Sequence, residues 1–169
     1  NCLSLTDADV VFGERLQKIG DRSFEKCSGI RNLRLPESVL SVDRNAFDGC
    51  QLDTVYVASK IQFPTDYRCL GANVNELTLA QGFLGEMPAA KTIHIMSMEV
   101  PESEPHRTHT VSTSVLVINF AGSQEAWEKG NYRVDPTTQI NFNVVFTFNY
   151  FCFIFSNSTN SNVFLFNVW

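Results

Sequence analysis

Apolar residues return at a fixed interval along the first third of the chain. The matching pairs, each 23 positions apart, are Leu16 and Val39, Ile19 and Val42, Ser23 and Ala46, Phe24 and Phe47, and Cys27 and Cys50. Leu33 and Leu35 return 22 positions later as Val55 and Val57. A fixed period in the twenties, with apolar residues in register, is typical of a solenoid. We therefore expect a stack of similar coils that share one core.

Each repeat contains a short stretch in which apolar and polar residues alternate. The two clearest examples are Leu33-Arg34-Leu35 and Val55-Tyr56-Val57. Alternation with a period of two predicts a strand whose apolar side chains face inward and whose Arg34 and Tyr56 face outward. Pro36 cannot donate a backbone hydrogen bond, so we expect the first strand to end there.

The polar stretches 21–26 and 44–48 are expected on the opposite side of each coil. Each stretch predicts a single helical turn or a short helix, in which Phe24 or Phe47 packs against the strand layer. Ser23 and Ala46 precede these phenylalanines and are small enough to allow close approach. A unit of this kind cannot bury its apolar side alone, whereas stacked units can.

Further strands are expected at 76–79, 92–95, 118–120 and 140–142, which gives about six stacked strands. Ser123 is placed to cap a short helix, Glu125 lies near its positive end, and Trp127 is expected to close the core. Residues 98–113 are expected to form an irregular insertion. The predicted core consists of Phe24, Cys27, Leu33, Leu35, Phe47, Cys50, Val55, Val57, Leu77, Leu79 and Trp127.

The residues 19–27 and 33–39, with a second copy at 42–50, resemble the BspA-type (treponemal) leucine-rich repeat. The resemblance lies in an apolar residue, Ser or Ala, Phe, Cys, a strand and Pro36-Glu37-Ser38-Val39. It implies an α/β repeat fold, a leucine-rich-repeat solenoid with a short parallel strand in each repeat of about 22–23 residues and short helices or turns opposite. The resemblance also implies a secreted or cell-surface protein of bacteria or some parasitic protists, with a role in adhesion or protein binding.

We expect the solenoid to occupy residues 1–144. Cys2 and Leu5 take the places of Cys27 and Ile30, so the chain is expected to start inside a truncated repeat, as a fragment of a longer protein. Any signal for export would then lie before Asn1.

Residues 145–169 form a separate tail that is rich in aromatic residues and asparagine and has no charged side chain. One interpretation is a β-hairpin that caps the open end of the solenoid. A second is a non-native read-through product of AT-rich sequence, whose codons specify Phe, Asn, Ile and Tyr. A third is a membrane or partner-docking segment, although about ten apolar residues are too few for a spanning helix.

The charge pattern excludes several classes of partner. The formal net charge is −5 and no cluster of basic residues occurs, which argues against nucleic acid and anionic membrane surfaces. No apolar run of about 20 residues is present, so we expect no transmembrane segment in this chain.

The sequence predicts no catalytic residue, no metal site and no cofactor. The five cysteines are spaced unlike zinc ligands, and an interior stack of thiols is preferred over a disulfide ladder. His106 and His109 could meet a metal, yet Pro101 and Pro105 interrupt any helix that would align them, so a solvated loop is favoured. Asn157-Ser158-Thr159 fits a glycosylation acceptor, which has meaning only in a eukaryotic secretory pathway.

The outward side of the strands is the candidate binding surface. Its predicted partner-binding residues are Arg34, Tyr56, Thr78, His94 and Asn119. Arginine and tyrosine are over-represented at binding hot spots, which makes Arg34 and Tyr56 the expected anchors. For any single residue, including His94, a plain surface position is favoured, and the hypothesis is that the face binds collectively. We expect a non-catalytic module that binds a protein, such as a host extracellular-matrix or surface protein, or a glycan. The alternative is a spacer that presents another domain and has no ligand.

Overall fold

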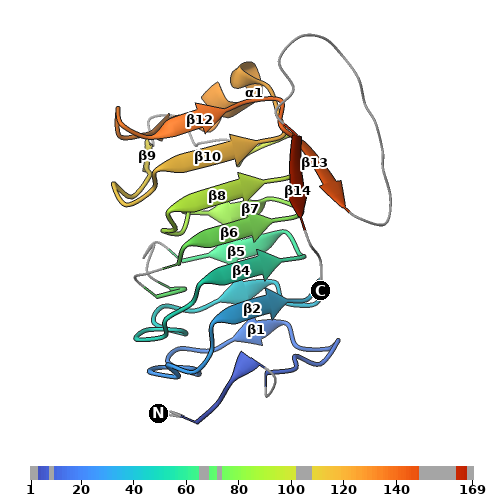
Figure 1. Ribbon diagram of the computed structural model, residues 1–169, viewed down its shortest axis with the longest axis vertical. Coiled ribbons are helices and arrows are strands. Elements are labelled where there is room, and N and C mark those ends of the chain that lie inside the picture. Colours follow the sequence, from blue (N-terminus) through green and yellow to red (C-terminus); the bar gives the residue numbers. More distant parts are fainter. Residues whose placement is uncertain are drawn as a thin grey trace.

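The computed structural model describes residues 4–7, 10–64, 69–71, 74–101, 108–148 and 163–166. Within these residues the chain winds into coils that stack along the long axis, with one wide sheet running the length of the stack (Figure 1). The strands of this sheet are parallel, so the predicted solenoid is confirmed.

The described residues form fourteen strands and one helix. They are β1 (Lys18–Ile19), β2 (Asn32–Leu35), β3 (Ser41–Val42), β4 (Thr54–Val57), β5 (Ile61–Phe63), β6 (Glu76–Leu79), β7 (Phe83–Gly85), β8 (Thr92–Ile95), β9 (His109–Thr110), β10 (Val117–Phe120), α1 (Gln124–Glu128), β11 (Tyr132–Arg133), β12 (Gln139–Asn141), β13 (Val145–Phe148) and β14 (Val163–Phe166).

Six parallel strands form the main sheet, in the order β12-β10-β8-β6-β4-β2. The paired residues Asn32, Thr54 and Glu76 lie 22 positions apart, Glu76 and Thr92 lie 16 apart, and Thr92 and Val117 lie 25 apart. The number of strands in this sheet agrees with the sequence prediction. One coil is shorter and the next is longer than 22 residues. The strands still pair, because a coil needs only to bring the chain back beside the preceding strand in the same register.

A second, four-stranded sheet has the order β1-β3-β5-β7 and was not predicted as a sheet. Its strands are only two or three residues long, too short for an alternating pattern to stand out. Ile19 and Val42, both part of the 23-residue pattern, pair directly in this sheet. A separate pair, β9 and β11, is also parallel; β9 lies inside the stretch 98–113 that was expected to be irregular.

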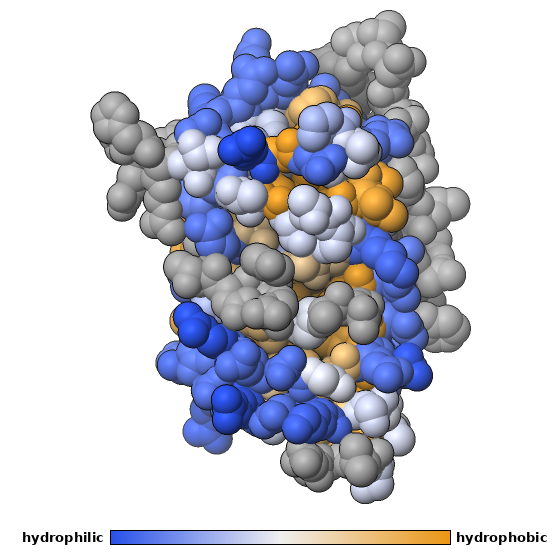
Figure 2. All heavy atoms as spheres, turned by 90° about the vertical axis from the view of Figure 1, so that its left-hand side faces the viewer, coloured by the Kyte–Doolittle hydropathy of each residue, from blue (hydrophilic) through white to orange (hydrophobic). Residues whose placement is uncertain are grey.

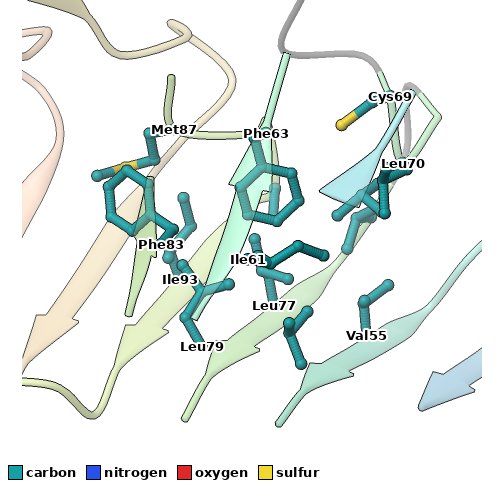
Figure 3. Close-up of a cluster of buried hydrophobic side chains, with 14 of the residues drawn as sticks. Val55, Ile61, Phe63, Cys69, Leu70, Leu77, Leu79, Phe83, Met87 and Ile93 are labelled. Atoms are coloured by element: carbon teal, nitrogen blue, oxygen red, sulfur yellow. The ribbon is translucent and has the colours of Figure 1, made fainter. Parts of the chain in front are cut away.

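The core lies between the two sheets. Figure 3 shows Val55, Leu77 and Ile93 of the main sheet pointing toward Ile61, Phe63 and Phe83 of the second sheet. Of the predicted core residues, Phe24 is half-buried and the others are buried. Each large apolar side chain that is fully buried contributes roughly 1.5–3 kcal/mol to stability.

The stretches 21–26 and 44–48 are turns and not short helices. Their backbone hydrogen bonds span three residues, as from Glu25 N to Arg22 O at 3.2 Å. Arg22 and Asn45 have φ angles of 56° and 58°, outside the right-handed helical region, so the helix cannot propagate. The coils are instead joined sideways, as by the bond from Phe24 N to Ala46 O at 2.8 Å.

The predicted short helix at the late repeat is α1. Ser123 is its N-cap and accepts a hydrogen bond from the backbone of Ala126, and Glu125 lies in the first turn. Trp127 is the buried residue of the helix, and its ring centroid lies 5.8 Å from that of Phe120. This helix therefore closes the core over β10 as expected.

The last two described strands do not form the hairpin considered for the tail. β13 and β14 pair in parallel, from Val145 with Val163 to Phe148 with Phe166. Two parallel strands cannot be joined by a tight turn and need a long crossover. The segment that connects them, including Asn157, lies outside the described residues. No helix in the described part of the chain is long and apolar enough to cross a membrane.

Candidate interaction surface

The outward face is the side of the main sheet that points away from the core. It includes Asn32, Arg34, Thr54, Tyr56, Glu76, Thr78, Thr92, His94, Asn119 and Asn141. The strand register puts Arg34, Tyr56, Thr78, His94 and Asn119 side by side in one row. All five predicted binding residues therefore belong to a single line across the strands, but the two halves of that line differ.

The half formed by β2 and β4 is open to solvent. Arg34 is exposed and Tyr56 is partly exposed, and the Arg34 guanidinium carbon lies 4.4 Å from the centroid of the Tyr56 ring. This distance is within the range of a cation–π interaction, worth about 0.5–1 kcal/mol at an exposed site. The contact favours a conformation with the arginine over the tyrosine, and the pair forms a platform of the residue types favoured at binding hot spots.

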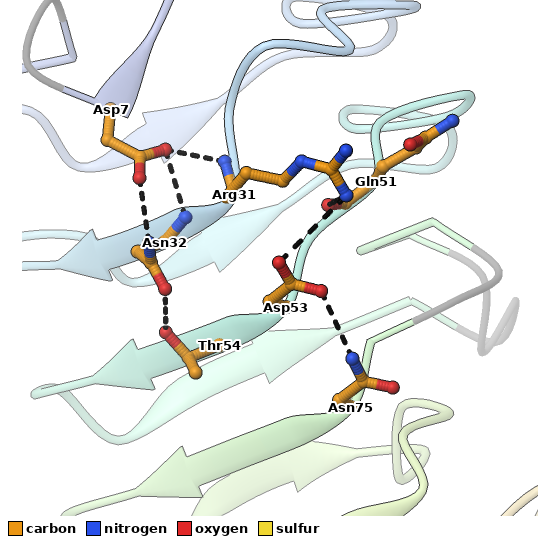
Figure 4. A network of polar contacts seen from close by, with 7 residues as sticks. All are labelled: Asp7, Arg31, Asn32, Gln51, Asp53, Thr54 and Asn75. Atoms are coloured by element: carbon orange, nitrogen blue, oxygen red, sulfur yellow. Dashed lines mark hydrogen bonds and ion pairs between the residues drawn. The ribbon is translucent and has the colours of Figure 1, made fainter.

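A polar network stiffens the edge next to this platform (Figure 4). The Asp7 carboxylate accepts hydrogen bonds from the backbone N–H of Arg31 and from both the backbone and the side-chain N–H of Asn32. The Thr54 hydroxyl donates to Asn32 Oδ1 at 2.7 Å. Burial raises the pKa of Asp7, but the hydrogen bonds from Asn32 and Arg31 outweigh it and leave the pKa lowered. Asp7 is therefore ionised at neutral pH and fixes the edge of β2.

A second polar row lies one position before the strands. Arg31 Nη1 lies 3.9 Å from Asp53 Oδ2, and Asn75 Nδ2 donates to Asp53 Oδ1 at 3.1 Å (Figure 4). The side of the molecule at which the main strands begin is largely hydrophilic over the first coils, and apolar surface shows between polar residues further along the stack (Figure 2). The exposed ion pair contributes little to stability, so we regard this row as a solvated margin of the sheet.

The half of the row formed by β6, β8 and β10 is covered. Thr78, His94 and Asn119 retain only 8%, 5% and 1% of their exposure. His94 is therefore not the plain surface residue that the sequence suggested. The missing information was the position of Phe146, whose ring meets the His94 ring edge-on with centroids 6.0 Å apart.

Hydrogen bonds fix the polar side chains under this cover. Asn141 Nδ2 donates to Asn119 Oδ1 at 2.8 Å, which leaves Asn119 Nδ2 to donate to His94 Nδ1 at 3.2 Å. His94 Nδ1 must then be unprotonated, and the ring proton is assigned to Nε2. Burial lowers the pKa of His94 to about 4, so the ring is neutral at physiological pH.

A buried polar cluster lies away from the outward face and was missed by the sequence analysis. His109 Nδ1 lies 3.2 Å from Glu86 Oε2, and the His109 and Tyr132 ring centroids are 5.2 Å apart. His109 is 6% exposed, so its predicted place in a solvated loop is wrong; His106 lies outside the described residues. The 23-residue interval between His109 and Tyr132 was the available signal, since these residues pair in β9 and β11.

The phenol oxygen of Tyr132 is buried and has no hydrogen-bond partner within the described residues. Burial, and then the negative charge of Glu86, raise the pKa of Tyr132. The described residues contain no group of three or more His, Cys, Asp or Glu side chains placed to hold a metal ion. Glu86, His109 and Tyr132 thus form a polar inclusion in the core, with Trp127 and Phe83 packed against Tyr132.

The cysteines within the described residues are buried. Cys27, Cys50 and Cys69 are thiols in successive coils. Cys50 Sγ donates to the carbonyl oxygen of Phe24 at 3.0 Å, and burial raises the pKa of Cys50 to about 11. Such a thiol is a poor nucleophile at neutral pH. Cys2 and Cys152 lie outside the described residues.

Comparison with known proteins places these coils in a family. The sequence profile of the BspA type leucine rich repeat region matches residues 1–84 in six copies. No curated protein and no solved structure matches the chain. Leucine-rich repeat domains are protein-interaction modules and generally non-catalytic, and repeats of this family are typical of surface-associated proteins. The matched repeats and the stacked parallel coils together show that residues 1–84 of this chain belong to the BspA-type leucine-rich repeat family.

Proposed function

We propose that this chain is a non-catalytic recognition or adhesion module of a secreted or cell-surface protein, and that it binds a protein partner through the outward face. The observation that carries the proposal is the Arg34–Tyr56 platform, with the guanidinium 4.4 Å from the ring on the open half of the row. The contact already favours one arrangement of the two side chains before binding, which lowers the entropy lost when a partner engages them.

The position of the platform supports the same role. Arg34 and Tyr56 are paired in register on strands whose neighbouring inward residues, Leu33 and Val55, are buried in the core. A side chain on a strand supported in this way is held more precisely than one on a loop. Asp7, through Asn32 and Arg31, fixes the edge strand β2 of the same sheet as described.

A binding screen with the full chain tests the proposal. The chain is applied to arrays of extracellular-matrix proteins, host-cell surface proteins and glycans, and each hit is titrated. We expect saturable binding to a protein that weakens at least about tenfold in the double variant Arg34→Ala/Tyr56→Ala, because hot-spot residues contribute about 2 kcal/mol or more. Binding to a glycan alone would replace the protein partner by a carbohydrate.

Arg44→Ala is the matched control. Arg44 is exposed on a turn, on the side of the coil away from the outward face. Its removal changes the net charge as Arg34→Ala does but leaves the platform intact. Equal weakening in Arg44→Ala would show that binding depends on overall charge and would contradict the assignment to the outward face.

The second candidate function is a spacer without a ligand. It is favoured by the way the polar groups of the outward face satisfy one another, as in the chain of bonds from Asp7 through Asn32 to Thr54. A surface whose polar groups are already paired has less to gain from a partner. A folded chain that binds no member of the arrays would support this function.

A further inference from the structure

The two halves of the row on the outward face differ in exposure although they belong to one sheet. Arg34 is exposed and Tyr56 partly exposed, whereas Thr78, His94 and Asn119 are buried. All five carry polar groups and point away from the core. Polar residues at outward positions of a strand are normally solvated, so something on the outer side must cover the second group.

The covering element comes from the C-terminal part of the chain. Phe146 of β13 touches His94 of β8, edge to face, at a ring-centroid distance of 6.0 Å. Figure 1 shows β13 and β14 running steeply across the direction of the main strands, near the ends at which these strands finish. The contact crosses 52 positions of the sequence and joins the strand pair to the middle of the row.

The strand pair is attached differently from every coil of the solenoid. β13 and β14 form a two-stranded sheet of their own and contribute no strand to the main sheet. An isolated pair of strands is marginally stable in water. β13 begins directly after Val144, whose N–H donates to the carbonyl oxygen of Phe120 at 3.0 Å and whose side chain is buried. Beyond this tether, the position of the strand pair depends on side-chain contacts such as Phe146 with His94, which can be broken without opening the ladder.

We propose that the β13–β14 strand pair is an intramolecular cover, which occupies the outward face over β6, β8 and β10 and must move aside before a partner can bind there. The claim that the cover blocks a partner rests on the proposed function. It refines that function, because it restricts the open binding site to the Arg34–Tyr56 half of the row. Displacement would extend the binding row from Tyr56 to Thr78, His94 and Asn119.

The covered residues are suited to such a second role. When the cover leaves, His94 regains contact with water and Asn119 and Thr78 offer hydrogen-bonding groups to a partner. While the cover is in place, Asn119 is held by Asn141 and faces His94. The hydrogen bonds of Asn119 with His94 and Asn141 compensate for the burial of these side chains in the closed form, in which the Phe146 ring packs against His94.

The test uses the full chain with Phe146→Ser, and Phe146→Leu as the conservative variant. The readouts are the NMR titration of His94 and its rate of modification by diethylpyrocarbonate. Loss of the ring contact should raise the open population of the cover by up to about tenfold. We therefore expect faster modification of His94, up to about tenfold, and a pKa of His94 that moves from about 4 toward its usual value of 6.5 in Phe146→Ser. Phe146→Leu should stay close to the parent chain.

Leu84→Ser serves as the control for replacing a partly exposed apolar residue by serine elsewhere. Leu84 lies on β7 of the second sheet and is 40% exposed. It should leave His94 unchanged. A low pKa of His94 and slow modification in Phe146→Ser would overturn the proposal. Loss of thiol protection at Cys27, Cys50 and Cys69 in that variant would overturn it too, because the strand pair would then be part of the fold and not a cover.

Measuring partner binding by the parent chain and by Phe146→Ser separates this inference from the proposed function. Any protein that binds the parent chain in the array should bind Phe146→Ser more tightly, up to about tenfold. If His94 opens in Phe146→Ser but neither protein binds the array, the cover stands and the recognition function fails. If a partner binds both proteins equally although His94 has opened, the recognition function stands and the inhibitory role of the cover is refuted.

Discussion

Five non-glycine residues in the described part of the chain have left-handed backbone angles. They are Arg22, Lys26, Asn45, Asn131 and Asn143. Asparagine tolerates this region, whereas a long side chain with an ordinary Cβ does so at a cost. Lys26 has a φ of 58°, and the equivalent place 23 positions later is Gly49, with a φ of 74°. The two coils thus place different residues at the same left-handed position of the turn, and glycine adopts this conformation with less strain than lysine.

Lys26→Gly is therefore expected to stabilise the chain. Relief of the left-handed strain outweighs the added freedom of glycine in the unfolded state by about 0.5–1 kcal/mol. The exposed contact of Lys26 with Glu25 at 3.7 Å is worth little in comparison. Urea unfolding at pH 7 measures the change, with an increase in the midpoint at constant slope.

Gly49→Ala is the reciprocal control. A Cβ at Gly49 would lie 2.9 Å from Cγ of Lys26 while φ remains at +74°, so we expect a loss of about 1–2 kcal/mol. A neutral effect of both substitutions would mean that the two turns relax freely and that strain at position 26 does not contribute to stability.

The burial of His94 makes a pH dependence of stability predictable. Its pKa is about 4 in the folded chain and 6.5 in an unstructured peptide, so the unfolded chain binds the proton more readily. Stability from the neutral ring is present above pH 6.5 and is lost as the pH falls to about 4, by about 2–3 kcal/mol in all. Urea unfolding at several pH values between 7 and 4 measures this loss.

His94→Gln isolates that contribution. Glutamine retains an oxygen that can accept the Asn119 amide but does not titrate. Carboxylates with lowered pKa values, such as Asp7, destabilise both proteins equally in acid. The parent chain should thus lose stability more steeply than the variant between pH 6.5 and 4; parallel curves would show that His94 is solvated in the folded chain.

At the scale of elements, a row of phenylalanines supports the turn side of the first coils. Phe24 and Phe47 stack with centroids 5.0 Å apart and an interplanar angle of 5°, and Phe12 meets Phe24 edge-on at 5.8 Å. Phe47 is fully buried whereas Phe24 is half-buried. The phenylalanine at this position of the repeat is therefore expected to contribute different amounts of free energy to stability in the two coils.

We expect Phe47→Ala to destabilise the chain by about 3–5 kcal/mol and Phe24→Ala by clearly less. The first substitution leaves a cavity between coils, whereas the second removes one side of a ring pair that solvent can partly replace. Thermal and urea unfolding of both variants give the comparison. Equal losses would indicate that the ring stack, which both substitutions abolish, dominates over cavity formation.

The elements that the sequence predicted are those whose signal is local. Leu33 and Leu35 alternate with polar residues, and this alone defines β2. Ser123 caps α1 through an interaction with Ala126, only three positions away. For the stretch 21–26 the sequence left a single turn and a short helix open, because the left-handed angle of Arg22 leaves no mark in the sequence. β1 and β3 were not recognised as strands, since two residues cannot show a period.

The candidate site was predictable only in part for a related reason. The row through Arg34, Tyr56 and Thr78 follows from the repeat, because these paired positions recur every 22 residues. His94 joins the row after a shortened coil and was placed there by its own strand, 92–95. The burial of His94 within this row was not predictable, because it involves the ring of Phe146, a contact between distant segments. No periodic pattern encodes such a contact. The Glu86–His109 pair joins β9 to the loop after β7 and was hidden in the same way.

At the scale of the whole molecule, three buried thiols report on how the solenoid opens. Cys27, Cys50 and Cys69 lie in successive coils that share one core. In a stacked array each coil is stabilised by its neighbours, so neighbouring coils tend to unfold together. The raised pKa of Cys50 further suppresses reaction from the folded state.

In a Cys2→Ser/Cys152→Ser background, we expect these three thiols to resist a thiol reagent in native buffer. They should become reactive over the same range of urea concentration, because reaction requires the coils to separate. Mass spectrometry of the labelled peptides resolves each cysteine. A thiol that reacts without urea would reveal a coil that opens independently of the others.

Because the strands of the main sheet keep their register along the whole stack, the distance between strands limits which kind of bound segment can match them. Adjacent strands stand about 4.8 Å apart, so a row such as Arg34, Tyr56 and Thr78 repeats at that distance. One turn of an α-helix advances by about 5.4 Å, a mismatch of about 0.6 Å for each strand. Side chains on one face of an extended chain repeat about every 6.8 Å and fall out of step within two strands. A helix that lies along the stack can thus place about one side chain over each strand of the main sheet, whereas an extended chain cannot.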